Sequence, residues 1–366
     1  MTERLPASRL RIDPRIYDGY YSDVYFNRAR DILLALGQRP KVALQFFQKH
    51  DNTVLCGIEE ALAILEGAPR SDELKVFALN DGSVVDAYET VMVIFGDYTL
   101  FGYLETVLLG AMAESTVVAT NVRQAVEAAA PKPVLFFPAR FGRWTRQTAD
   151  GYAAWKSGAL AASTEPAAEW WGSPAVGTVP HALIAALGGD TVAATIAFAR
   201  KFPDIPCISL VDFDNDCVNT SLKVARAMQA EGLTLWGVRL DTSATMVDRS
   251  LMDQLGQFPP TGVNPVLVRN VRRALDEAGF NDVKIVVSGG FDAERIRRFE
   301  EQGVPADVYA VGSSLLKGER DFTADVVLLE AGPGDPVDFS IEGWDFRHCS
   351  KVGRRFKWND RLLRVW

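Results

Sequence analysis

Two adjacent glycines between an apolar run and an amphipathic segment could form a phosphate site. In the stretch VKIVVSGGFDAERIRRF, residues 283–299, β-branched residues typical of a buried strand precede Gly289 and Gly290. Asp292 can cap the segment that follows, whose apolar residues recur at helical spacing. Glycines there would leave backbone N–H groups uncovered at a helix N-terminus, where a phosphate binds favourably. The alternative is a tight turn that needs glycine only for a positive φ.

Two aspartates and two arginines also end apolar runs and could act on a substrate. Asp212 and Asp241 close two runs that one helical pattern separates, so we expect them near each other. Together they could hold a hydrated Mg²⁺ ion or ribose hydroxyls. Arg239 lies two residues before Asp241 and so points to the same side of its strand, and Arg140 follows the run LFFPA. Each arginine would either meet an anion or form an internal ion pair with a carboxylate.

His181 is one of three histidines and lies between Gly177-Thr178 and an apolar helical pattern. A histidine at such a helix start could be structural, or it could act as a nucleophile or an acid. The sequence holds no Walker loop, no G-x-G-x-x-G fingerprint and no Ser-His-Asp pattern that would point to other chemistry. The four cysteines form no C-x-x-C pair, so neither a disulfide scaffold nor a metal site built by the protein is predicted.

The elements that must position these residues alternate between strands and helices. Five short apolar runs, PVLFFPAR, CISLVDF, LWGVRLD, VKIVVSGG and VYAVGSS, are separated by helical patterns at residues 190–201, 216–231, 264–279 and 292–302. This alternation predicts a parallel sheet with right-handed crossovers. The polar and glycine residues all follow the carboxyl ends of the runs, where a β/α barrel has its active site and where its last two loops bind phosphate. The last two loops here are SGG and GSS, which favours the phosphate site over the simple turn.

A second domain is predicted from the two ends of the chain. Strand patterns at residues 42–48, 53–56, 74–79 and 84–96 surround a short helix at 58–67, with turns at Asn80-Asp81-Gly82 and Gly96-Asp97. A long buried helix is expected from about 103 to 129, and FTADVVLL with the basic tail should return as strands. We therefore predict an α+β domain at residues 1–115, joined by 320–366, and a β/α barrel at 116–319.

Composition narrows the class of protein. The 366 residues carry a net charge of −8, which speaks against a nucleic-acid partner. No apolar run approaches the length of a membrane span, and the N-terminal MTERLPASRLRIDPR lacks an apolar signal core. Scattered cysteines fit a reducing compartment, so a cytoplasmic enzyme without a membrane partner is expected.

Several motifs, in order, resemble nicotinate phosphoribosyltransferases over roughly residues 16–355. They are SDVYFNRARDIL, VLCGIEEALAILEG, FGYLETVLLGAMAESTVVAT, GTVPHALIAALGGD, LVDFDND, WGVRLDTS, VVSGGFD and YAVGSSL. The resemblance implies a type II phosphoribosyltransferase: an irregular β/α barrel with an N-terminal α+β sandwich domain completed by C-terminal strands, in a homodimer with shared active sites. It also implies the reaction of nicotinate with 5-phosphoribosyl 1-pyrophosphate (PRPP) to nicotinate mononucleotide and pyrophosphate in NAD salvage. Mg²⁺ is the implied cofactor, and ATP is a co-substrate that drives the reaction through a phosphohistidine.

The same resemblance implies roles for particular residues. His181 of GTVPH matches the phosphorylated histidine, and Arg239 and Asp241 of RLD would contact the pyrophosphate or base and the ribose. The residues implied to bind the base or pyrophosphate are Asp23, Tyr25, Arg140 and Asp212, with Asp23 and Tyr25 reaching the neighbouring subunit's base site and Tyr25 stacking on the ring. The residues implied to bind the 5-phosphate are Ser288, Gly289, Gly290, Gly312 and Ser313.

Two segments depart from the family pattern. Relatives usually read F-G-A-R-R where this chain reads FFPARFGRW, so Phe141 stands in place of the second arginine. A glycine-rich segment of the C-D-G-V-S type is replaced by ASTEPAAEWWGSPA. Both regions lie near the base in the family. The alternatives are therefore an enzyme that uses PRPP with another base, a quinolinate enzyme, and a phosphate-binding homologue without catalysis.

Overall fold

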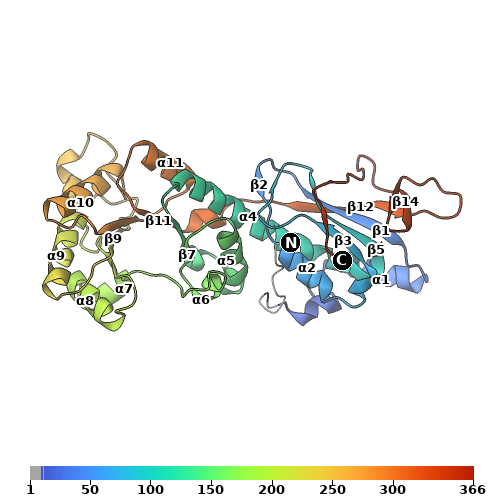
Figure 1. Ribbon diagram of the computed structural model, residues 1–366, viewed down its shortest axis with the longest axis horizontal. Coiled ribbons are helices and arrows are strands. Elements are labelled where there is room, and N and C mark those ends of the chain that lie inside the picture. Colours follow the sequence, from blue (N-terminus) through green and yellow to red (C-terminus); the bar gives the residue numbers. More distant parts are fainter. Residues whose placement is uncertain (1–9, 11) are drawn as a thin grey trace. The chain divides into compact units, whose positions relative to one another are not determined.

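The computed structural model describes residue 10 and residues 12–366 and divides the chain into two compact units (Figure 1). One unit comprises Met1–Thr120 with Gly318–Trp366, and the other comprises Asn121–Lys317. The stretch MTERLPASR, in which we looked for a signal core, lies outside the described residues.

The first unit contains an antiparallel sheet of order β13-β14-β12-β1-β5-β3-β15. Its strands are β1 (Lys41–Gln48), β3 (Lys75–Ala78), β5 (Thr90–Asp97), β12 (Phe322–Glu330), β13 (Phe339–Ile341), β14 (Trp344–His348) and β15 (Leu363–Arg364). The predicted return of FTADVVLL as a strand is confirmed, because β12 pairs with β1 along nearly its whole length. The basic tail was also predicted to form strands, but only its residues Leu363–Arg364 do so, as β15. The turn predicted at Gly96-Asp97 is wrong: both residues belong to β5, which runs on to meet β1 through Lys41 and Val42.

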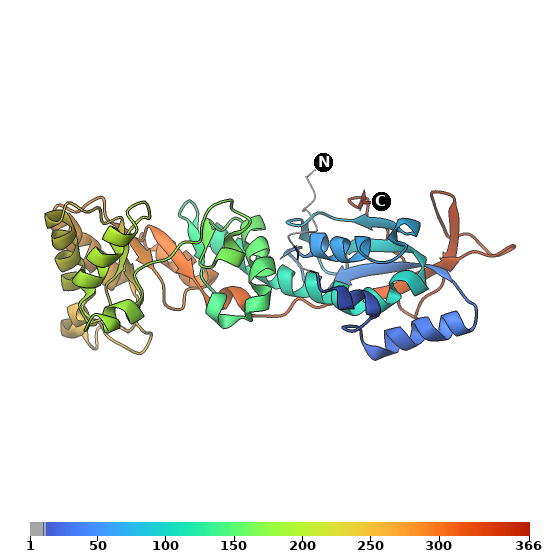
Figure 2. The same ribbon diagram turned by 90° about the horizontal axis from the view of Figure 1, so that it is seen from below.

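Helices of the first unit differ sharply in burial. They are α1 (Val24–Ala35), α2 (Ile58–Glu66), α3 (Tyr98–Phe101) and the first part of α4 (Glu105–Ala129), beside a small sheet of β2 (Thr53–Val54) and β4 (Val84–Val85). Apolar residues of α2 and α4 join those of β1, β3 and β5 in one core. By contrast α1 has no buried residue, and it lies at the edge of this unit (Figure 2).

The second unit holds an all-parallel sheet of order β7-β6-β11-β10-β9-β8. Its strands are β6 (Val134–Phe136), β7 (Ala161–Ala162), β8 (Ile208–Leu210), β9 (Gly237–Leu240), β10 (Lys284–Val287) and β11 (Val308–Val311). The first and last strands of the chain order, β6 and β11, are paired, so the sheet curves into a barrel that is open between β7 and β8. An extended segment crosses this opening, since the Val176 N–H donates to Ala162 O at 2.9 Å and the Val179 N–H donates to Ile208 O at 3.0 Å.

Helices between these strands complete the unit (Figure 1). They are α5 (Gln147–Lys156), α6 (Glu165–Ala168), α7 (His181–Ala186), α8 (Thr191–Lys201), α9 (Cys217–Ala230), α10 (Pro265–Glu277) and α11 (Ala293–Glu301). Short 3-10 helices elsewhere in the chain are η2 (Pro14–Asp18), η3 (Ser71–Glu73), η4 (Gly102–Leu104), η5 (Ala139–Phe141), η6 (Trp144–Arg146), η7 (Arg249–Gln254) and η8 (Ser313–Leu316). All five predicted strands and all four predicted helices are present, and β7 was missed. In the described part of the chain no helix is both long and apolar enough to cross a bilayer.

Candidate active site

A cavity of about 390 Å³ opens at the carboxyl ends of the parallel strands. Five of the six strands or their following loops line it, through Phe137, Ala139, Arg140, Phe141, Ser163, Thr164, Arg239, Asp241, Ser288, Gly289, Gly290, Phe291, Ala310, Gly312 and Ser313. This is the end of the sheet at which α/β barrels carry their active sites. The predicted phosphate residues Ser288 to Gly290, Gly312 and Ser313 all lie on its wall.

Arg239 lies at the centre of a hydrogen-bonded cluster on one side of the cavity. Its Nη2 donates to Asp241 Oδ2 at 2.8 Å, its Nε to Ser288 Oγ at 2.9 Å and its Nη1 to Thr178 Oγ1 at 3.0 Å. Ser288 Oγ in turn lies 2.7 Å from Asp241 Oδ1, so both oxygens of this carboxylate are engaged. Of the two alternatives that the sequence left open for Arg239, an anion or an internal ion pair, the structure shows the ion pair with Asp241. The cluster holds the Asp241 carboxylate in one orientation beside the cavity.

The glycine pair after β10 adopts two consecutive left-handed conformations. Gly289 has φ +84° and Gly290 has φ +77°, values that a side chain disfavours. In the described part of the chain, no protein atom accepts a hydrogen bond from the backbone N–H groups of Gly289, Gly290 or Phe291. The glycines therefore meet the requirement of the turn, and they also leave unpaired donors beside the cavity, as an anion site needs.

The second glycine loop follows β11 and begins the 3-10 helix η8 (Ser313–Leu316). Among the described residues, the N–H groups of Gly312 and Ser313 likewise have no protein acceptor. An ideal Cβ on Gly312 would lie 3.1 Å from Cε2 of Phe141, so the Phe141 ring packs closely against this glycine. The ring thus lies against the second loop on the cavity wall.

Arg140 lies in η5, directly after β6, and its guanidinium is 5.4 Å from the centre of the Phe141 ring. Within the part of the chain that the structure describes, Arg140 has no carboxylate partner, whereas Arg239 is paired with Asp241. The cavity wall therefore offers one cation that is free to meet a substrate anion.

His181 is the first residue of α7, and its Nε2 lies 3.1 Å and 3.2 Å from the two oxygens of Asp212. The Asp212 side chain is almost buried, and the His181 side chain is 46% exposed. Burial raises the pKa of Asp212, the negative charge of Asp241 raises it further, and the contact with His181 opposes both. The interaction with Asp241 agrees with the expected proximity of the two aspartates. Among the described residues, His181 and Asp212 are not part of the cavity wall.

Asp23 and Tyr25 belong to the first unit, at the beginning of α1. The Asp23 N–H donates to Thr106 Oγ1 at 3.0 Å, and Asp23 Oδ2 accepts from Thr106 Oγ1 at 3.0 Å and from the Tyr25 hydroxyl at 3.2 Å. Tyr25 is 58% exposed.

The Arg239 cluster and the cavity wall also contain residues that the sequence did not single out for the site. Thr178 precedes His181 in the GTVPH motif and contacts Arg239, a pairing across 61 residues that no local pattern reveals. Ser163 and Thr164 follow β7, which has only two residues and too little apolar pattern to be recognised. In the described residues no group of three or more His, Cys, Asp or Glu side chains could hold a metal ion alone.

Known proteins with similar sequences and structures carry related names. A nicotinate phosphoribosyltransferase from Mycobacterium tuberculosis is 31% identical over 241 residues, which make up 65% of this chain and 49% of the relative. The crystal structure of nicotinate-nucleotide pyrophosphorylase from Pyrococcus furiosus is similar with a TM-score of 0.77 at 30% identity, over 97% of this chain and 82% of that chain. This chain belongs to the nicotinate phosphoribosyltransferase family.

Two further comparisons concern the N-terminal part of the chain and the fold. Residues 23–116 match the family model described as quinolinate phosphoribosyl transferase, N-terminal domain. The human nicotinic acid phosphoribosyltransferase structure has a TM-score of 0.65 at 18% identity, over 86% of this chain and 75% of that chain, which is a likeness of fold. The predicted type II phosphoribosyltransferase fold is thereby confirmed. The chain spans about half the length of the curated relatives it matches.

Proposed function

We propose that this protein is a nicotinate phosphoribosyltransferase that joins nicotinate to PRPP, forming nicotinate mononucleotide and pyrophosphate for NAD salvage. The observation that carries the proposal is the cavity wall, where two glycine loops with unpaired N–H groups face a fixed Arg239–Asp241 pair. The loops supply uncharged donors for the 5-phosphate. Asp241, whose carboxylate is already oriented, is suited to accept hydrogen bonds from ribose hydroxyls.

The chemistry requires positioning more than strong acids or bases. The bond between ribose C1 and the pyrophosphate oxygen breaks, the ribose becomes oxocarbenium-like, and the ring nitrogen of the base forms the new bond to C1. Arg239 faces the leaving pyrophosphate from the centre of its cluster. Asp241 is the carboxylate on the cavity wall that would hold a Mg²⁺ ion, and the ion would supply positive charge to neutralise the leaving group.

The charges on the cavity wall favour a base with one carboxylate. Arg140 is the cation without a carboxylate partner among the described residues of this wall, and Phe137 and Phe141 supply apolar surface beside it. Nicotinate matches one unpaired cation. Quinolinate would bring a second carboxylate without a second free cation, a costly arrangement in a confined site.

ATP coupling is proposed through His181. If Nε2–H donates to Asp212, Nδ1 keeps its lone pair and can attack the γ-phosphorus of ATP, so that the bond to ADP breaks as the N–P bond forms. The half-exposed ring leaves room for a nucleotide to approach.

A homodimer with shared active sites is also part of the proposal. Helix α1 and Leu36, which follows it, expose large apolar side chains, among them Val24 (56%), Ile32 (59%) and Leu36 (66%), which a second copy would cover. Tyr25 and Asp23 at the start of the same helix would then reach the base site of the neighbouring subunit.

The test is pyrophosphate release from PRPP in the presence of Mg²⁺ and ATP, with nicotinate, nicotinamide and quinolinate in separate reactions. Release that depends on nicotinate is expected. Release that depends only on another base would favour the second candidate, a PRPP-dependent enzyme for a different base, which the presence of Phe141 on the cavity wall motivates. Binding of PRPP without release from any base would indicate a phosphate-binding homologue.

A further inference from the structure

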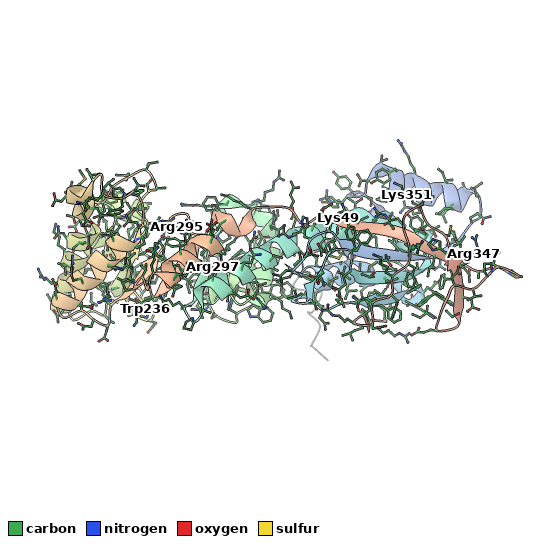
Figure 3. All side chains as sticks on the ribbon, turned by 90° about the horizontal axis from the view of Figure 1, so that it is seen from above. Lys49, Trp236, Arg295, Arg297, Arg347 and Lys351 are labelled. Atoms are coloured by element: carbon green, nitrogen blue, oxygen red, sulfur yellow. The ribbon has the colours of Figure 1, made fainter. Side chains whose placement is uncertain are left out.

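Arg295 contacts the glycine loop from behind. It lies on α11 (Figure 3). Its Nη1 donates to the carbonyl oxygens of Gly289 at 2.7 Å and Gly290 at 3.0 Å. Its Nη2 donates to Val263 O at 2.5 Å, and its guanidinium lies 4.3 Å from the centre of the Phe291 ring. The side chain is thus held through both Nη atoms and against an aromatic ring.

These contacts determine where the loop N–H groups point. In a planar trans peptide the carbonyl of one residue and the N–H of the next point in opposite directions. Since Arg295 holds the carbonyls of Gly289 and Gly290, the N–H groups of Gly290 and Phe291 are directed away from Arg295. Ser314 Oγ donates to Phe291 O at 2.6 Å, which orients the following N–H, that of Asp292, in the same manner. Arg295 thus orients two of these three consecutive donors and Ser314 orients the third, and none of the three has a protein acceptor in the described part of the chain.

Arg295 also contributes charge. Among the described residues, the hydrogen-bond acceptors of its guanidinium are three carbonyl oxygens, and no carboxylate forms an ion pair with the guanidinium. Burial lowers the pKa of this guanidinium, and the negative charge of Asp292 opposes that shift. A phosphate dianion on the other side of two peptide groups would compensate the positive charge of Arg295.

We propose that Arg295 is a positioning residue for phosphate binding: it fixes the peptide groups of the Gly289-Gly290 loop and places a positive charge behind them. This inference rests on the phosphate site of the proposed function. It adds a residue that needs no contact with the substrate and that acts through the backbone.

The experiment measures ribose 5-phosphate binding by calorimetry to the full chain and to Arg295→Met and Arg295→Lys. We expect Kd to rise at least 30-fold for Arg295→Met and about 3- to 10-fold for Arg295→Lys, which keeps the charge and one donor group. Added guanidinium ion should restore part of the affinity of an Arg295→Ala variant.

Two controls separate this role from a general effect on folding or charge. Arg272 also binds backbone carbonyls, those of Val283 at 2.7 Å and Phe280 at 2.9 Å, so Arg272→Met should lower stability without changing Kd. Arg297 is exposed on the same helix, so Arg297→Met removes a charge from α11 and should leave Kd within twofold (Figure 3).

Wild-type affinity for ribose 5-phosphate in a folded Arg295→Met or Arg295→Lys protein would overturn the inference, as would a wild-type protein that does not bind the sugar phosphate. Turnover of PRPP by the wild type, measured in parallel, tests the proposed function separately. A wild type that turns over PRPP while Arg295→Met keeps its affinity would refute the role of Arg295 alone.

Discussion

Replacing Gly289 by alanine distinguishes the two roles that the glycine pair can have. An ideal Cβ on Gly289 would lie 3.4 Å from Thr242 O and 3.6 Å from Asp241 Oδ1, which are ordinary contacts. The cost to folding is then the left-handed backbone at φ +84°, about 1 kcal/mol for alanine. The methyl group would also enter the cavity beside Asp241. Loss of one hydrogen bond to a charged phosphate, about 1.5–3 kcal/mol, would raise the KM for PRPP roughly 10- to 100-fold.

Gly279 provides a matched control for this variant. It has φ +83°, nothing lies within 4 Å of its ideal Cβ, and it follows α10 outside the cavity wall. Gly279→Ala should therefore lose the same stability as Gly289→Ala but keep the KM for PRPP. The assay is steady-state kinetics at saturating nicotinate, with thermal unfolding of both variants. Equal losses of stability with an unchanged KM in both would refute the phosphate role and leave the glycine pair as a turn.

Three further changes test other parts of the site and the fold. His181→Ala should abolish stimulation by ATP and leave slow turnover without ATP; ATP coupling that persists in this variant would reject the phosphohistidine. Arg140→Met should raise the KM for nicotinate about 10- to 100-fold, because one hydrogen bond to a charged group is lost, and should leave the KM for PRPP unchanged. Similar increases in both KM values would contradict the assignment of Arg140 to the base. Burial raises the pKa of Glu105 from 4.5 to about 7, and the negative charges of Asp325 and Asp23 contribute to this shift. The folded state therefore holds the Glu105 proton more tightly than the unfolded state does. As a result, the free energy of unfolding falls as the pH rises between these two pKa values. Glu105→Gln should remove this fall, which we expect to be about 1–2 kcal/mol after solvent screening of a half-buried group. Urea unfolding of both proteins from pH 4.5 to 8 measures it. Parallel curves of unfolding free energy against pH for the wild type and the variant would contradict this prediction.

Local sequence patterns were sufficient to predict a strand or helix where its own residues determine its structure. The run before Ser288 is β-branched and apolar, and the structure buries Ile285, Val286 and Val287 completely in β10. Asp292 caps α11 through the Arg295 N–H at 2.8 Å, as its position before an amphipathic segment predicts. Because the carboxyl ends of parallel strands meet at one edge, the order of the strands also brought the two glycine loops together.

Long-range contacts account for what the sequence could not reveal. Thr178 meets Arg239 because the segment around it crosses the open side of the barrel, an arrangement that depends on hydrogen bonds to Ala162 and Ile208. The contact of Arg295 with the glycine carbonyls is local in sequence, but its helical pattern indicates only an amphipathic helix. Sequence also left open whether Arg239 meets a carboxylate or an anion, and the structure shows the carboxylate contact, with the cavity beside it.

The most direct test of the central claim is to identify by mass the nucleotide formed from nicotinate, PRPP, Mg²⁺ and ATP, by the wild-type protein and by Asp241→Asn prepared in the same way. Asp241→Asn keeps the size of the side chain and removes the charge that pairs with Arg239 and orients the ribose. We predict nicotinate mononucleotide from the wild type, formed faster with ATP, and a loss of at least 100-fold in rate for the variant. No mononucleotide from the wild type, or equal amounts from both proteins, would contradict this claim.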